Sequence, residues 1–360
     1  MSKLSYDCLN DIFEYLENDK DTLHSCILVN RLWCEVSVRI FWRNGYDYNI
    51  SNLNTLVACL PNESKEILNE NGIIISTPTS KFPIFNYASF CKILPIYRVR
   101  SKIRKLLNNQ QSISFTNLNN NVIIVEREIH KMLMNQISLK KLIFFQYRKV
   151  PFNPQTFTLY IGSKDCLKNL SELNCNSSIS SEFFYQLSKI CHNIILLKIT
   201  IEKYISNGLS DLIRAQKNLK YFSMTLYDED KNISLLIKNL PNTLINLNLY
   251  GYNYISLSFI SKFINLQELI ISIYNGDVLG FEELQNIIFP KLQILNFECE
   301  CPKYEEFIKF LENNGKNLKE LYVGDDHIED IKGYNDISLN LAIVKLCPNL
   351  RKLSTGFGMI

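Results

Sequence analysis

Two periodicities of apolar residues divide the chain. In the first 42 residues the apolar positions recur every three or four residues, as in Leu9, Ile12, Phe13 and Leu16, which is the spacing of one face of a helix. Beyond residue 138, apolar side chains recur instead at positions zero, three and five of a short template that returns nine times. The first pattern predicts a small helical module, and the second predicts short strands in an array of repeats.

Three short helices are predicted within residues 4–42. Ser5 is a suitable N-cap for the first helix, because its hydroxyl can accept a hydrogen bond from a free backbone N–H. Asn18–Asp21 forms a turn, the second helix starts near Thr22, and a third follows a brief break at Asn30–Arg31. Forty residues cannot easily bury so many large apolar side chains. The surplus is expected to contact either a partner protein or the next domain of this chain.

The order of anchor residues in this module resembles the F-box motif. The resemblance covers Leu4 to about Trp42, and its most specific part is Leu28-Val29-Asn30-Arg31-x-Trp33. Ser5 and Asp7 depart from the family's proline and glutamate. The resemblance implies docking onto the Skp-type adaptor of a cullin-based ubiquitin ligase, the SCF complex. By position, the adaptor-binding residues would be Leu4, Leu9, Ile12, Phe13, Leu16, Leu23, Cys26, Val29 and Trp33. Some of this set is expected to hold the three helices together instead.

The connecting region, residues 45–125, has mixed patterns. Helical faces are predicted at Leu53–Leu60 and Glu63–Asn71, followed by a short strand at Ile73–Ile75. Asn117–Asn121 has the composition of a loop or linker before the repeats.

A cluster of basic residues lies at Arg98–Lys105. Several cations on one face could bind phosphates, so an RNA-associated repeat protein is one alternative. However, Val99, Ile103 and Leu106 interleave with the cations at helical spacing, which favours an amphipathic helix with a solvated basic face.

The repeated template begins at nine apolar residues spaced 22 to 32 residues apart: Leu139, Leu170, Ile194, Leu219, Leu244, Leu266, Leu292, Leu318 and Leu350. Helix-like stretches lie between these strands, so each unit needs neighbours on both sides to bury its apolar residues. The array, from about Glu126 to the C-terminus, resembles the leucine-rich repeats found behind F-boxes. The asparagine or cysteine expected eight residues into each repeat is replaced, for example by Tyr227 and Tyr274, so we expect no regular ladder of side-chain hydrogen bonds.

The predicted fold is therefore an α/β solenoid, an irregular leucine-rich-repeat arc, preceded by a small three-helix F-box module. The predicted domains are the F-box at 1–44, a helical connecting region at 45–125 and the solenoid at 126–360.

The repeat pattern also predicts a binding face. Period-two alternation turns template positions two, four and six away from the core. This strip, which also includes Asn176 and Ser272, is polar, with acids toward the C-terminal end, and favours a protein target with a basic segment. An ordinary solvated sheet face is the alternative. The residues assigned to the target-binding face are Tyr221, Asn248, Tyr250, Glu268, Glu298, Glu320 and Tyr322.

Composition and charge add few constraints. The 360 residues are 46% apolar with a net charge of +3, so the field of the whole protein favours neither nucleic acid nor a membrane surface. The eleven cysteines mostly lie singly in apolar patterns and are typical of buried thiols in a reducing compartment. The N-terminus lacks the pattern of a secretory leader, and we expect a cytoplasmic or nuclear protein.

No catalytic pattern is found. The four histidines lie on different predicted elements, and neither a phosphate-binding glycine loop nor a nucleophile elbow is present. Cys299-x-Cys301 lacks the second pair of a zinc site, and Asp325-Asp326-His327 is more typical of a solvated loop than of a cation site. We expect no cofactor and no enzymatic activity.

The resemblance to F-box proteins with leucine-rich repeats, together with the lack of a catalytic pattern, implies a non-catalytic substrate-recognition adaptor of an SCF ubiquitin ligase, which would bind the Skp-type adaptor, a cullin scaffold and an unknown protein target. Proximity within the assembly would then supply the catalytic advantage. The alternative is a repeat scaffold or inhibitor that acts without ubiquitin transfer. Neither a nucleic acid nor a membrane is expected as a partner.

Overall fold

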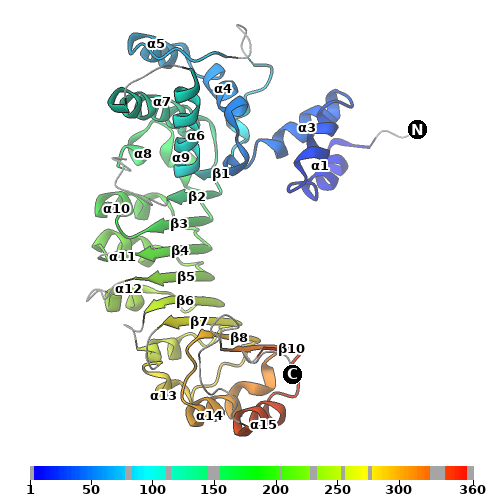
Figure 1. The fold of residues 1–360 in the computed structure, drawn as a ribbon, viewed down its shortest axis with the longest axis vertical. Coiled ribbons are helices and arrows are strands. Elements are labelled where there is room, and N and C mark those ends of the chain that lie inside the picture. Colours follow the sequence, from blue (N-terminus) through cyan, green and yellow to red (C-terminus); the bar gives the residue numbers. More distant parts are fainter. Residues whose placement is uncertain are drawn as a thin grey trace. The chain divides into compact units, whose positions relative to one another are not determined.

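The computed structural model describes residues 4–77, 83–110, 115–144, 155–202, 204–227, 233–252, 256–274, 278–324 and 337–354. Ten strands form a parallel sheet in chain order, β1 to β10, and helices are interleaved with them (Figure 1). The contacts divide the chain into two compact units, Met1–Asn174 and Cys175–Ile360. No helix within the described segments is long and apolar enough to cross a membrane.

Unit 1 begins with the three predicted helices: α1 (Tyr6–Glu14), α2 (Lys20–Ile27) and α3 (Arg31–Phe41). Each begins at a residue whose side chain accepts a hydrogen bond from the first turn, which satisfies a free backbone N–H. The predicted cap Ser5 accepts from Cys8 N at 3.3 Å. Asp19 caps α2, and Asn30 caps α3 by accepting from Trp33 N at 3.0 Å. The expected break at Asn30–Arg31 is therefore the start of α3.

The three helices share one small core. Trp33 packs edge-on against Phe13, with the ring centroids 5.1 Å apart. Arg43, just beyond α3, forms an ion pair with Glu14 that lowers the pKa of this carboxyl and ties α1 to the end of α3. The buried side chains of this core are Leu9, Phe13, Leu23, Cys26, Val36 and Ile40.

The rest of unit 1 contains further helices and the first strands. Its elements are η1 (Gly45–Asp47), α4 (Ile50–Ala58), α5 (Asn62–Glu70), η2 (Tyr87–Phe90), β1 (Ile93–Pro95), α6 (Ile96–Gln110), α7 (Phe115–Gln136), β2 (Lys141–Phe144), α8 (Gln155–Leu159), α9 (Ser163–Leu167) and β3 (Glu172–Asn176), the last of which runs across the boundary between the units. Helices α4 and α5 confirm the two predicted helical faces.

Two predictions for this region are wrong. Ile73–Ile75 is not part of the sheet that the structure describes; Ile73 is buried and Ile74 is exposed. Asn117–Asn121 is not a linker but lies in α7, where Leu118 and Val122 are buried at helical spacing. Burial of this face outweighs the weak helix propensity of asparagine. The predicted domain boundary after residue 125 therefore falls inside a continuous helix.

Unit 2 repeats a strand followed by a helix. Its strands are β4 (Leu196–Ile201), β5 (Tyr221–Leu226), β6 (Asn246–Tyr252), β7 (Glu268–Tyr274), β8 (Ile294–Cys299), β9 (Glu320–Val323) and β10 (Lys352–Ser354). Its helices are α10 (Ser181–Ile190), α11 (Asn207–Arg214), α12 (Ile233–Asn239), η3 (Leu257–Lys262), α13 (Phe281–Leu284), α14 (Tyr304–Asn314), η4 (Gly315–Asn317) and α15 (Ile337–Leu346). The predicted strand positions are confirmed, and the helical stretch between β6 and β7 is the 3-10 helix η3.

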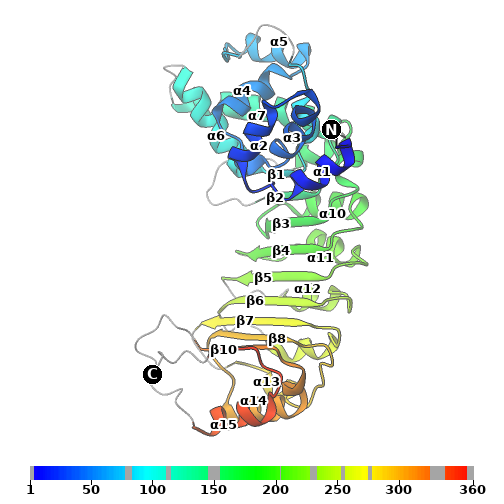
Figure 2. The same cartoon turned by 90° about the vertical axis from the view of Figure 1, so that its right-hand side faces the viewer.

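The register of unit 2 follows the apolar template. Leu219, Phe222 and Met224, at positions zero, three and five, are buried, and their equivalents on β6 to β9 are buried too. Helices α10, α11 and α12 lie on one side of the strands (Figure 1), and strands β4 to β8 lie side by side (Figure 2). Within the described residues no helix covers the other side of these strands, where most side chains at positions two and four are at least partly exposed.

Buried side-chain amides connect successive strand–helix pairs of unit 2. The Oε1 atom of Gln216 accepts from Ile194 N at 3.0 Å, while its Nε2 donates to Cys191 O at 2.7 Å. Asn314 makes the equivalent bonds to Phe289 N and Ile287 O, at 2.7 and 2.9 Å. Each amide satisfies backbone groups in the turn before a strand, so it fixes where that strand begins.

Candidate protein-interaction surfaces

Four residues assigned to adaptor binding are in the core of the N-terminal module. Leu9, Phe13, Leu23 and Cys26 are each no more than 7% exposed and contact one another across the three helices. Their burial leaves almost no surface for a partner, so they hold the module together. Sequence spacing could not make this distinction, because core residues and contact residues share the same helical period.

The remaining assigned residues reach the surface to different extents. Leu16 and Trp33 are half-buried against the core. Leu4, Ile12 and Val29 are exposed. Substitution of Trp33 is therefore expected to act mainly on folding, through its contact with Phe13.

Two exposed residues had been left out of the assigned set. Leu28 is 76% exposed beside Val29, which is 57% exposed, in the turn between α2 and α3. Tyr15, at the end of α1, is 92% exposed. The exposure of Leu28 could have been predicted from its position in the Leu-Val-Asn-Arg block between two helices. Tyr15 does not follow the apolar spacing, so the sequence pattern did not indicate its exposure.

The uncovered face of unit 2 is made of rows that run across the strands. The parallel register aligns each template position with its equivalent on the next strand, so side chains of one row lie about 5 Å apart. The position-two row is Tyr221, Asn246, Glu268, Ile294, Glu320 and Lys352. The position-four row is Ser223, Asn248, Ile270, Asn296, Tyr322 and Ser354. All seven residues assigned to the target-binding face lie on these strands, with Tyr250 and Glu298 at position six.

The centre of this face combines apolar side chains with carboxylates. Ile270 and Ile294, both half-buried, lie on neighbouring strands. Burial raises the pKa of the Tyr250 hydroxyl, and the negative charges of Glu298 and Glu268 raise it further. The sequence prediction did not include the two isoleucines, because it assigned only polar residues of these rows to the binding face. We name Tyr250, Glu268, Ile270, Ile294 and Glu298 the central patch.

The carboxylates of the face differ in their partners. Asn246 donates to Glu268, and Asn296 donates to Glu298 at 3.1 Å; within the described residues neither carboxylate has a cationic partner. Glu320 is paired with Lys352 at 3.2 Å and accepts from Tyr322 at 2.8 Å. Glu268 and Glu298 thus carry the uncompensated negative charge of the central patch.

Two members of the predicted strip are not available for binding. Ser272 is 1% exposed, with its hydroxyl oxygen 3.7 Å from the sulfur of Cys299. Asn176 is fully buried and donates to Glu202. Both face neighbouring strand ends that cover them, so alternation alone overestimated the accessible surface.

The basic cluster at Arg98–Lys105 lies on α6 and is largely used in internal contacts. Arg100 is buried and paired with Glu126 at 3.4 Å. Lys102 donates to the carbonyl oxygens of Tyr46 and Tyr48. Arg100 therefore contradicts the expectation of a wholly solvated basic face, and these internal contacts also weaken the RNA alternative.

The candidate catalytic and metal residues do not converge. His24 and His192 are exposed, whereas burial lowers the pKa of His130 to about 3 and keeps it neutral. None of the eleven cysteines, all of which lie in described segments, forms a disulfide. Among the residues that the structure describes, no three His, Cys, Asp or Glu side chains are placed to hold one metal ion. The Asp325-Asp326-His327 segment lies outside the described residues.

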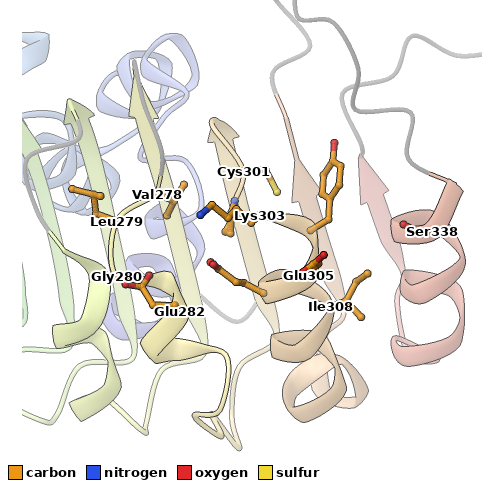
Figure 3. A pocket seen from close by; sticks show the side chains of 12 residues that line it. Val278, Leu279, Gly280, Glu282, Cys301, Lys303, Glu305, Ile308 and Ser338 are labelled. Atoms are coloured by element: carbon orange, nitrogen blue, oxygen red, sulfur yellow. The ribbon is translucent and has the colours of Figure 1, made fainter.

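A hollow of about 930 Å³ lies beside the first turns of α13 and α14 (Figure 3). Glu282 and Glu305 line it from those turns, where carboxylates favour the positive end of a helix dipole. Burial raises the pKa of the Cys301 thiol in its wall to about 12, which keeps this thiol protonated at neutral pH. These charges have a structural role, and the thiol is not an activated nucleophile.

No protein-family model and no curated protein matches the chain, so a functional assignment rests on the residues and the geometry described above.

Proposed function

We propose that the chain is the substrate-recognition subunit of an SCF-type ubiquitin ligase. Its three-helix module would act as an F-box that docks onto a Skp-type adaptor, and the leucine-rich-repeat-like face of unit 2 would hold the protein target. The chain itself would supply no reacting group; its contribution would be to hold the target near a separate conjugating enzyme.

The observation that carries this proposal is the exposure of Leu28 and Val29. The module already has a complete core, so these two side chains are not left over from an unfinished fold. Adjacent large aliphatic residues in a turn form a small apolar projection, and such surfaces mark contacts with other proteins. They also belong to the most specific block of the F-box resemblance.

The docking test is a double substitution, Leu28→Asp with Val29→Asp, in the full chain. Because both side chains are exposed, folding should change by less than about 1 kcal/mol. Loss of two anchors should weaken adaptor binding by at least about 100-fold. Binding is measured by isothermal titration with a purified Skp-type adaptor, and cullin is then sought in pull-downs.

The matched control is Leu341→Asp with Val344→Asp on α15, where a leucine and a valine are 65% and 77% exposed. This pair has the same residue types and similar exposure outside the module, so adaptor binding should not change. Equal adaptor affinity of the Leu28/Val29 variant and the native chain would overturn the docking proposal. Adaptor binding without cullin or ubiquitin transfer would support the scaffold or inhibitor instead.

Point variants are preferable to deletion of residues 1–44. Trp42 is buried and its ring lies 5.4 Å from that of Tyr48 and 4.6 Å from that of Tyr87. Deletion would therefore expose an aromatic cluster in the connecting region and confuse loss of docking with loss of folding.

The target-binding face is tested separately by Glu268→Lys with Glu298→Lys. Proximity labelling by the native chain should yield proteins that this variant no longer labels, because a basic segment would meet reversed charge. Glu66→Lys with Glu70→Lys, on the exposed side of α5, makes the same charge change elsewhere and should label the native set. Identical labelling by both variants would exclude the central patch as the target site.

A further inference from the structure

A second hollow, of about 400 Å³, lies in unit 2 where strands β8, β9 and β10 begin. Four cationic side chains line it: Lys291, Lys316, Lys319 and Arg351. None of its lining residues is acidic. The site thus concentrates positive charge in one concave place, on a chain whose net charge is only +3.

The four charges are not neutralised within the described residues, where none of the four side chains forms an ion pair. Lys319 instead donates to Oε1 of Gln293 at 2.7 Å, and Lys291 donates to Oδ1 of Asn265 at 2.9 Å. Neutral amide oxygens orient the ammonium groups but leave their charge in place. Two of the four cations are therefore oriented while their charge stays uncompensated.

The strand register brings like charges together. Lys319 N donates to Gln293 O, and Arg351 N donates to Lys319 O, so Lys319 and Arg351 are neighbours at the starts of β9 and β10. Like charges facing each other on adjacent strands are destabilising. The equivalent residues are Lys220 before β5 and the uncharged Ile245 and Gln267 before β6 and β7, so a cation occurs at this position but is not required by the fold. Within the described part of unit 2, only Lys319 and Arg351 are adjacent cations at this position. A bound anion would offset the repulsion between Lys319 and Arg351.

We propose that this hollow binds a phosphate monoester group, carried either by a small phosphate compound or by a phosphorylated side chain of a protein. A monoester at neutral pH has close to two negative charges and three acceptor oxygens. The planar guanidinium of Arg351 can bind two of these oxygens at once, and each lysine adds a point charge. A volume of about 400 Å³ is within the range of small-ligand sites and holds a phosphate with part of its carrier.

A polynucleotide fits less well. It carries one charge per phosphate along an extended path and is bound by cations spread along a stripe or groove. Here the four cations converge on a single hollow. The proposal concerns unit 2 alone and does not depend on ubiquitin ligase function.

The test compares Lys316→Gln with Arg351→Gln, made together in the full chain, against the native protein. Both side chains are exposed, so the double variant should fold normally. Isothermal titration in phosphate-free buffer of low ionic strength uses three probes: inorganic phosphate, a neutral peptide with or without one phosphoserine, and a single-stranded oligonucleotide. We expect monoester binding to the native chain and about 100-fold weaker binding to the double variant, about tenfold for each charge-assisted contact.

The matched control is Lys217→Gln with Lys220→Gln, which removes two exposed cations where β5 begins, outside the hollow. It should keep native affinity. Phosphopeptide binding tighter than that of free phosphate would identify a modified protein as the source, and equal binding would identify a small phosphate compound; both support the site. Failure of the native chain to bind either monoester, equal weakening in both variants, or binding of the oligonucleotide alone would overturn the proposal.

Discussion

Asn313 and Asn314 provide a direct test of how burial sets the value of a hydrogen bond in unit 2. Both are asparagines at the end of α14, and the Nδ2 atom of each donates to a backbone carbonyl in the turn after α13. Asn313 donates to Gln285 O and Asn314 donates to Ile287 O, each at 2.9 Å. Asn313 is exposed, whereas Asn314 is fully buried. Asn314 also accepts from Phe289 N at 2.7 Å. The perturbation is alanine at one position or the other.

The expected magnitudes differ because water can replace only one of the two side chains. In Asn313→Ala, solvent reaches the freed carbonyl, and the free energy of unfolding should fall by about 0.5 kcal/mol. In Asn314→Ala, a backbone N–H and a carbonyl lose a buried partner, at about 1–3 kcal/mol for each group before relaxation. We expect a net loss of about 3 kcal/mol. For a unit of the length of unit 2, this corresponds to a fall of about 6–12 °C in Tm.

The assay is scanning calorimetry, which can separate transitions of the two units, combined with hydrogen exchange. In Asn314→Ala the amide proton of Phe289 should exchange much faster than in the native chain, and in Asn313→Ala it should not change. Equal Tm shifts in the two variants, or unchanged exchange at Phe289 in Asn314→Ala, would refute the conclusion that this amide fixes the turn before β8.

Two further predictions concern backbone conformation and pH. Gly251 has φ of +131°, and an added Cβ would lie 1.9 Å from Leu226 O, so Gly251→Ala should lower the free energy of unfolding, measured in urea, by more than about 2 kcal/mol. Gly72 has φ of +67° with open space around it, so Gly72→Ala should lower the free energy of unfolding by about 1 kcal/mol. Burial raises the pKa of Glu126 to about 7, while Arg100 acts in the opposite direction. Since the folded state binds this proton more tightly, its stabilising contribution is complete below pH 4.5 and is lost as pH rises through 7. The stability of Glu126→Gln relative to the native chain should therefore rise by up to about 3 kcal/mol between pH 5 and pH 8, and a constant difference in urea unfolding would contradict this.

The strands of unit 2 could be predicted because their pattern has a single physical cause. Leu219, Phe222 and Met224 are apolar for the same reason as their equivalents, since each strand faces its own helix and can bury only alternate residues. The same logic fails where burial comes from distant contacts. Asn117–Asn121 looks like a linker locally, but it is helical because its apolar residues pack against other elements of unit 1.

The candidate sites were less predictable than the fold. Period-two alternation identified Tyr250 and Glu298 on the accessible face, but it also included Ser272, whose burial depends on Cys299 in the neighbouring strand. The basic hollow joins residues from three successive turns, and single turns carry only one or two of its cations. Nothing within one turn distinguishes such a cation from an ordinary surface lysine, so this site becomes visible only through the register of the strands.

The block from Leu28 to Trp33 allows the folding role of a short motif to be separated from its proposed role in recognition. Asn30 caps α3 and Trp33 packs on Phe13, so these two positions are explained by the stability of the module. Leu28 and Val29 are largely exposed and contribute little to that core, so their proposed role is in docking. Asn30→Ala should therefore lower stability by about 1 kcal/mol and leave the affinity of the folded module for an adaptor unchanged. Aspartate at Leu28 and Val29 should lower the affinity for an adaptor and leave the stability nearly unchanged. If both variants lost stability and affinity in parallel, the motif would be structural throughout.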